Sequence, residues 1–109
     1  MRFNDYWQCI EACNKCIAVA NHCMVSCLEE KDVSKMTACI RLNLECVNIC
    51  KAAVEFMSTG SNYSSEICQL CADICEACAE ECSKHDMDHC KECAIACREC
   101  AEECMNMAS

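Results

Sequence analysis

The sequence predicts an all-α protein, specifically an antiparallel four-helix bundle with a cysteine-lined core. The 109 residues include one glycine and no proline, so helix breakers and turn formers are almost absent. Cysteines recur at steps of three and four residues, which is the spacing of one face of an α-helix. The clearest loop is STGSNYSS at residues 58–65, which holds the only glycine. The length fits a single domain spanning residues 1–109.

Four segments carry the helical pattern, at about residues 4–29, 34–57, 63–84 and 87–107. The start of the first is predicted at Asn4 or Asp5, where Asp5 and Gln8 have the spacing of a capping box. Asp32 or Ser34 is expected to cap the second segment, and residue 86, an aspartate, the fourth. Short connections make neighbouring helices antiparallel, and four helices of similar length form a bundle.

The cysteines of all four segments fall on, or next to, the stripe expected to face the core. The second segment has the thinnest stripe, with three cysteines and with Met36 and Asn43 in the same register, where Asn43 is expected to fix the register of the helices. A core built almost wholly of cysteine would be thin or hollow unless something fills it. The candidate ligands are Cys9, Cys13, Cys16, Cys23, Cys27, Cys39, Cys46, Cys50, Cys68, Cys71, Cys75, Cys78, Cys82, Cys90, Cys93, Cys97, Cys100 and Cys104.

Charge and N-terminal sequence narrow the class of protein. The net charge of −9 disfavours nucleic acid and anionic lipid as partners. The start MRFNDYWQCIEAC lacks the apolar run of a signal peptide, and no segment is long and apolar enough for a membrane span. We therefore expect a cytoplasmic protein whose thiols stay reduced. No nucleophile, base and orienting group occur together, so we expect no enzymatic activity.

Metal binding explains the cysteine stripes better than disulfides do. Cysteines at i,i+3 or i,i+4 have Cβ atoms about 5–6 Å apart, whereas a disulfide needs about 3.5–4.5 Å. Thiolates favour Cu(I), Zn(II) or iron–sulfur clusters, and the cysteine spacings typical of iron–sulfur proteins are missing. A zinc ion on four thiolates leaves two negative charges in the core, while one Cu(I) per thiolate leaves none. We therefore expect the core to bind many Cu(I) ions; the alternatives are a general thiolate buffer for zinc or cadmium, and a redox or structural helical protein with free thiols.

The two ends of the predicted bundle differ in composition. The end formed by the 29–35 and 83–88 connections gathers His85, His89, Met36 and Met87, and we expect metal to enter there. The aromatic residues and methionines at the other end predict an apolar plug, formed by Phe3, Tyr6, Trp7, Phe56, Tyr63, Met105 and Met107. Apolar residues beside the cysteine stripes predict that the metal-free chain is already helical; they are Ile17, Leu28, Ile40, Leu44, Val47, Ile49, Val54, Ile67, Ile74 and Ile95.

Runs along nearly the whole chain resemble the cytosolic copper storage proteins of bacteria. They are CIEAC, CNKC, NHCMVSCLEE, CIRLNLECVNIC, ICQLCADICEACAEECSKHD and HCKECAIACRECAEEC. The resemblance implies storage or detoxification of copper by a four-helix bundle that holds many Cu(I) ions on its inward cysteines and assembles as a homotetramer. It also implies that histidines at one open end take part in metal uptake, a role that falls by position on His85 and His89. Like the cytosolic members of that family, the chain shows no signal sequence at its start.

Overall fold

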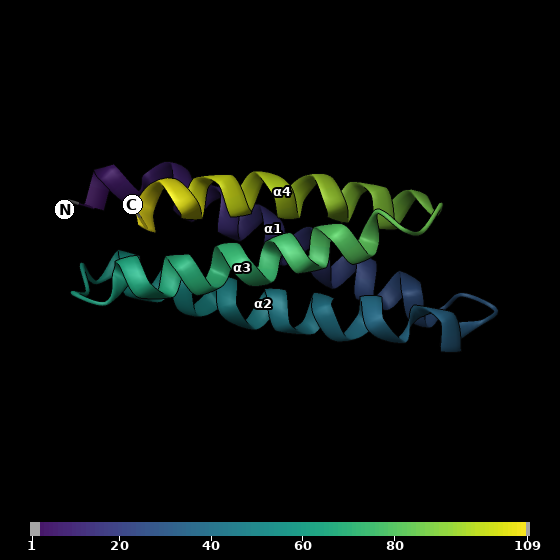
Figure 1. Cartoon of the computed structure of the whole chain (residues 1–109). Helices are drawn as coiled ribbons and strands as arrows, with labels where there is room; N and C mark the ends of the chain where they lie inside the picture. The colour runs from purple at the N-terminus through teal and green to yellow at the C-terminus, as the bar shows by residue number, and fades with distance from the viewer. Residues whose placement is uncertain (1–2, 109) are drawn as a thin grey trace.

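Four long antiparallel helices form the bundle shown in Figure 1, a computed structural model that describes residues 3–108. The predicted all-α four-helix bundle is confirmed. Short 3₁₀ helices at Phe3–Tyr6 and Val33–Met36 lead into the first two long helices. The four long helices are α1 (Trp7–Leu28), α2 (Thr37–Ser58), α3 (Ser64–Cys82) and α4 (Asp88–Ala108).

The starts of the helices differ from the predicted caps. Asp5 lies within a 3₁₀ helix, and the residue that precedes α1 is Tyr6, which makes no side-chain capping hydrogen bond. Asp32 precedes the second 3₁₀ helix and accepts a hydrogen bond from the Ser34 hydroxyl instead of capping the backbone. Tight 3₁₀ turns satisfy part of the backbone at both starts. The helix α1 therefore begins two residues after Asp5, and the capping box of Asp5 and Gln8 stays a prediction.

The helices pack in a closed ring in which α1 and α4 are also neighbours. The molecule is elongated, with principal extents of 46 × 18 × 17 Å. The α1–α2 and α3–α4 connections lie at one end, and the α2–α3 connection lies at the other end with both chain termini (Figure 1). Within residues 3–108, we find no helix with the length and apolar character needed to cross a membrane.

A Schellman motif ends α2 and makes the α2–α3 turn short. Gly60 has φ +65°, the left-handed conformation that glycine adopts without a side-chain penalty. The Gly60 amide donates to the Met57 carbonyl, and the Ser61 amide donates to the Phe56 carbonyl. The single glycine of the sequence therefore stands where the chain must reverse, which lets α3 start at Ser64 beside α2.

The apolar residues beside the cysteine stripes are less buried than the sequence suggested. Val47 is buried, and most of the others pack against the core with part of their surface exposed. Leu28, Leu44 and Ile95 are 55%, 50% and 57% exposed, so their predicted place beside the core was wrong. Helical periodicity fixes the centre of each inward stripe, but the helix packing decides how far each flank is covered.

Candidate metal centre

All 18 cysteines point into the bundle and are unbridged. Each is buried, with at most 1% of its surface exposed. Five come from α1, three from α2, five from α3 and five from α4. The structure thus brings together every cysteine that the sequence proposed as a ligand, and we call the set of their Sγ atoms the sulfur core.

The sulfur core joins all four helices through close Sγ–Sγ contacts. Cys16 and Cys46 are 3.3 Å apart, linking α1 to α2. Cys46 is 3.5 Å from Cys75 on α3, and Cys9 is 3.5 Å from Cys104 on α4. Several groups have all their sulfurs within 4.8 Å of one another and share members, including Cys13–Cys71–Cys100–Cys104, Cys16–Cys46–Cys50–Cys75, Cys50–Cys71–Cys75–Cys100, Cys23–Cys27–Cys39–Cys90 and Cys9–Cys68–Cys104.

Burial and contacts between thiols keep many of these groups protonated in the metal-free chain. Burial raises the pKa of the Cys27 thiol to about 11 and that of Cys90 to about 12. The hydrogen bond with Cys16 raises the pKa of the Cys46 thiol. Metal ions bind the thiolate form, so loading the sulfur core has to release protons.

Asn43 is a fully buried polar residue within the sulfur core. Its Oδ1 accepts hydrogen bonds from the thiols of Cys78 and Cys93, at 3.3 and 3.2 Å. Its Nδ2 lies 3.7 Å from Cys39, to which it donates. The sequence marked Asn43 only as a register residue, although a lone amide in a cysteine stripe was the signal that thiols would be its partners. The amide holds thiols from three helices in fixed positions.

His89 lies at the end of the sulfur core formed by residues 29–36 and 83–89, which we call the mouth. Its Nδ1 is 3.5 Å from Cys23, 3.9 Å from Cys27 and 3.5 Å from Cys90. Its Nε2 is 3.5 Å from a Glu30 carboxylate oxygen. Burial disfavours the charged imidazole, but the contacts with Cys23 and Glu30 outweigh it and raise the pKa of His89. His89 therefore connects the outer rim to three core thiols.

The second predicted histidine of the mouth, His85, makes a different contact. Its Nε2 is 2.9 Å from a carboxylate oxygen of Glu81, which also pairs with Lys84 at 3.6 Å. His85 lines a surface groove of about 510 Å³ at the mouth, together with Met87 and the buried Met36. The structure places His85 on the outer rim of the mouth and His89 against the thiols.

The opposite end of the bundle is closed by fewer residues than predicted. Tyr6 and Met57 are buried there, and Met107 packs against the core. The predicted plug was wrong for the remaining residues, which are at least 36% exposed, because one flank of each terminal turn faces water: Phe3, Trp7, Phe56, Tyr63 and Met105. Met57, which the sequence interpretation did not include, is fully buried at this end.

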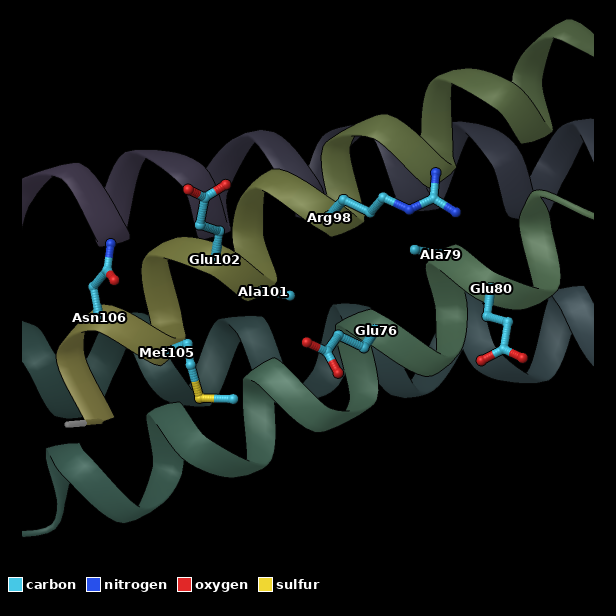
Figure 2. Close-up of a pocket in the computed structure, with 8 residues that line it drawn as sticks. All are labelled: Glu76, Ala79, Glu80, Arg98, Ala101, Glu102, Met105 and Asn106. Atoms are coloured by element: carbon cyan, nitrogen blue, oxygen red, sulfur yellow. The ribbon is translucent and has the colours of Figure 1, made fainter.

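A groove on the outer surface between α3 and α4 is separate from the sulfur core. It measures about 590 Å³, and Figure 2 shows the buried Ala79 and Ala101 with acidic side chains around them. No cysteine lines it. The eight lining residues are Glu76, Ala79, Glu80, Arg98, Ala101, Glu102, Met105 and Asn106.

Comparisons with known proteins agree with this architecture. The family model for copper storage proteins matches residues 3–109. A Bacillus subtilis protein named as the uncharacterized cysteine-rich protein YhjQ is 55% identical over 81 residues, which cover 74% of this chain and 75% of that protein.

Solved structures extend the similarity. Apo copper storage protein 3 from Bacillus subtilis is 53% identical with a TM-score of 0.89, covering 95% of this chain and 99% of that chain. The Cu(I)-bound copper storage protein BsCsp3 is 52% identical with a TM-score of 0.93, covering 99% and 100%. A cytosolic copper storage protein from Streptomyces lividans, loaded with five coppers, is 33% identical with a TM-score of 0.93, covering 97% and 93%. The chain belongs to the copper storage protein family.

Proposed function

We propose that this chain stores Cu(I) ions on the thiolates of the sulfur core. The observation that carries the proposal is the burial of all 18 cysteines in groups of converging sulfurs that draw on all four helices. Each Cu(I) neutralises one thiolate, so a filled core carries little net charge in a region without water. The similar structures named as Cu(I)-bound BsCsp3 and as the five-copper Streptomyces lividans protein support the same cargo. This is a storage function and needs no catalytic residue.

The alternative cargo is a divalent ion such as zinc or cadmium. A core filled with divalent ions on four thiolates each would carry two negative charges per ion, and no lysine or arginine is among its buried residues. The number of bound ions distinguishes the two cargoes. Copper should approach one ion per cysteine, whereas a tetrahedral ion should approach about one ion per four cysteines.

We propose that copper enters at the mouth through His89. The His89 imidazole contacts Cys23, Cys27 and Cys90, so after losing its proton it can bind a Cu(I) ion and transfer it to thiolates without movement of the backbone. His85 lies on the rim and would act earlier and more weakly, because its ring is held by Glu81. The exposed His22 provides a control away from the mouth.

The whole chain, residues 1–109, is proposed to act as one unit in the cytosol. The relative from Streptomyces lividans is named a cytosolic copper storage protein, which supports this location. A homotetramer is proposed from the resemblance to bacterial copper storage proteins. Sedimentation of the metal-free chain at several concentrations tests it, and a stable monomer would refute it.

The metal-free chain is proposed to be folded before copper binds. Residues such as Ile10, Val47 and Met57 are buried without any metal contact, and the apo form of the Bacillus subtilis relative has the same fold. Far-UV circular dichroism of the reduced, metal-free chain should show high helix content that changes little on adding Cu(I). A coil that gains helix only with metal would contradict this.

The decisive experiment is an anaerobic Cu(I) titration of the reduced chain against a chromophoric Cu(I) chelator. We expect the chain to outcompete the chelator for more than about a dozen ions. Replacing the three cysteines of α2 with alanine should lower the capacity, whereas Ile95→Ala, on the surface, should not. Binding that stops near four ions, with zinc displacing copper, would favour the divalent buffer.

The rate of Cu(I) uptake tests whether copper enters at the mouth. His89→Ala should slow Cu(I) transfer from the chelator while leaving the final number of ions almost unchanged. His85→Ala should have a smaller effect, and His22→Ala none. An unchanged rate in His89→Ala would place the entrance elsewhere.

A further inference from the structure

We propose that the copper-free chain binds Zn²⁺ first at a preformed tetrahedral site made by Cys50, Cys71, Cys75 and Cys100. The site lies inside the bundle and draws on α2, α3 and α4. The inference concerns a second metal at one place in the sulfur core, so it does not depend on the storage of copper.

The distances within this group match a zinc tetrathiolate. A tetrahedral ion with Zn–S bonds of about 2.3 Å has S–S edges of about 3.8 Å. Cys50 is 3.7 Å from Cys71, 3.8 Å from Cys75 and 3.7 Å from Cys100. Cys71 is 3.9 Å from Cys75, and all four sulfurs lie within 4.8 Å of one another. Four of the six edges therefore already have the required length.

The neighbouring group on α1, α2 and α3 fits a tetrahedral ion less well. In the group Cys16–Cys46–Cys50–Cys75, two edges are compressed, at 3.3 Å for Cys16–Cys46 and 3.5 Å for Cys46–Cys75. An ion there has to push sulfurs from different helices apart.

Two further groups have fewer edges of the right length. In Cys13–Cys71–Cys100–Cys104, the close pairs are Cys13–Cys100 at 3.6 Å and Cys13–Cys104 at 3.8 Å. At the mouth, Cys27 is 3.9 Å from Cys23 and 3.8 Å from Cys39, in the group completed by Cys90. The Cys50 group needs the least rearrangement of the four.

Neighbouring thiols offset the negative charge that a zinc tetrathiolate leaves in the core. When zinc binds, Cys100 and Cys75 become thiolates that can accept hydrogen bonds. Cys46 lies 3.5 Å from Cys75, so its S–H group can serve as a donor to the Cys75 thiolate. Hydrogen bonds to charged groups are the stronger kind, and they are available only while most of the core is free of metal.

Zinc and copper then exclude each other at the centre of the bundle. The four zinc ligands are also proposed Cu(I) ligands, and copper loading would remove the neighbouring S–H donors. The chain would therefore hold zinc at low copper and release it as Cu(I) fills the core.

The test uses Co²⁺ as a spectroscopic substitute for zinc, added anaerobically to the reduced, copper-free chain. We expect the intense visible bands of tetrahedral thiolate-bound Co²⁺ to develop over the first equivalent and to disappear on adding Zn²⁺. Single cysteine-to-serine variants locate the ion, and circular dichroism confirms that each variant is folded.

Cys50→Ser and Cys71→Ser should both lose the first-equivalent bands and weaken Zn²⁺ binding by at least about tenfold. Cys13→Ser, Cys16→Ser and Cys90→Ser should keep the bands, because none of the three is a ligand of the proposed site. Loss in Cys13→Ser, Cys16→Ser or Cys90→Ser with retention in Cys50→Ser or Cys71→Ser would move the site and overturn the proposal. Absence of tetrahedral bands in the native chain would also overturn it, while a Cu(I) titration would still judge copper storage separately.

Discussion

The α1–α2 hairpin and the α3–α4 hairpin fill their shares of the core with different residues. The first carries eight cysteines and has Ala20, Asn43 and Ala53 at other inward positions. The second carries ten cysteines. Beside the sulfur core, the first hairpin buries Ile10, Val47 and Met57, whereas the second buries Ser64 and five alanines: Ala72, Ala79, Ala94, Ala96 and Ala101.

Because of this difference, the two hairpins contribute unequally to the stability of the metal-free fold and to the number of thiols available for copper. Burying an aliphatic side chain contributes about 1.5–3 kcal/mol, far more than burying the single methyl group of alanine. Alanine in turn lets neighbouring helices approach closely, because the distance between helix axes depends on the side chains at the contact. The first hairpin therefore supplies more of the apolar stabilisation of the metal-free fold, and the second supplies more of the thiols.

The largest expected effect is a loss of stability from the first hairpin. Ile10→Ala removes a side chain that is 3% exposed and should lower the free energy of unfolding by about 2–5 kcal/mol. Denaturant unfolding of the reduced, metal-free chain measures it. Ile95→Ala on the exposed surface of α4 is the matched control and should change stability by less than about 0.5 kcal/mol. Equal losses in both variants would break the proposed division between the hairpins.

Enlarging a buried alanine should destabilise the second hairpin. Ala101→Leu adds bulk at a position that lines the α3–α4 groove (Figure 2) and is only 3% exposed. We expect a loss of about 1–3 kcal/mol from overpacking. Ala77→Leu, at an exposed position of α3, serves as the control. A stabilised Ala101→Leu chain would show that the groove is a packing defect that a larger side chain can fill.

Copper capacity can be raised in the first hairpin, where the stripe is incomplete. Ala20 is fully buried at an inward position of α1. Ala20→Cys should increase the Cu(I) capacity by roughly one ion per chain, since thiolates favour Cu(I). Ala18→Cys places a thiol on the exposed face of the same helix and should leave the core capacity unchanged. The same capacity in all three chains would mean that thiol number does not limit storage.

The smallest expected effect concerns how the stability of the fold depends on pH, through one mouth cysteine of each hairpin. The pKa of Cys27 rises from 9.0 to about 11 and that of Cys90 from 9.0 to about 12 on folding. Above pH 9 the unfolded chain loses these protons first, so it binds fewer protons than the folded chain and stability falls as pH rises.

Unfolding of the reduced, metal-free chain at pH 8, 9 and 10 should therefore show progressively lower stability. Cys27→Ala and Cys90→Ala should each reduce this slope. Slopes in Cys27→Ala and Cys90→Ala equal to that of the native chain would contradict the raised pKa values of the two thiols.

Much of this molecule could be predicted from residue spacing. Cysteines at steps of three and four determined the four helices and the inward direction of all 18 thiols, because an α-helix of any register keeps such residues on one face. The exposure of Leu44 could not be predicted in the same way, since it depends on how the neighbouring helices are rotated and spaced.

Contacts between helices could not be predicted from the sequence either. The contact of His89 with Cys23 on α1 joins two helices and depends on how they pack, whereas His85 and Glu81 are only four residues apart in the sequence. In the sequence, His85 and His89 were equivalent candidates for the mouth. Only the packing of the helix ends shows that His89 contacts the thiols and His85 does not. The role of Met57 in closing the far end was hidden for the same reason.

The positions of the termini have a practical consequence. The first 3₁₀ helix and the last turn of α4 lie at the end opposite the mouth (Figure 1), in a molecule 46 Å long. A linker fused to either terminus, or a resin coupled through it, would leave the rim around His89 facing the solution. The chain could thus be immobilised as a metal-scavenging material, with every copy oriented to take up ions from the liquid that flows past.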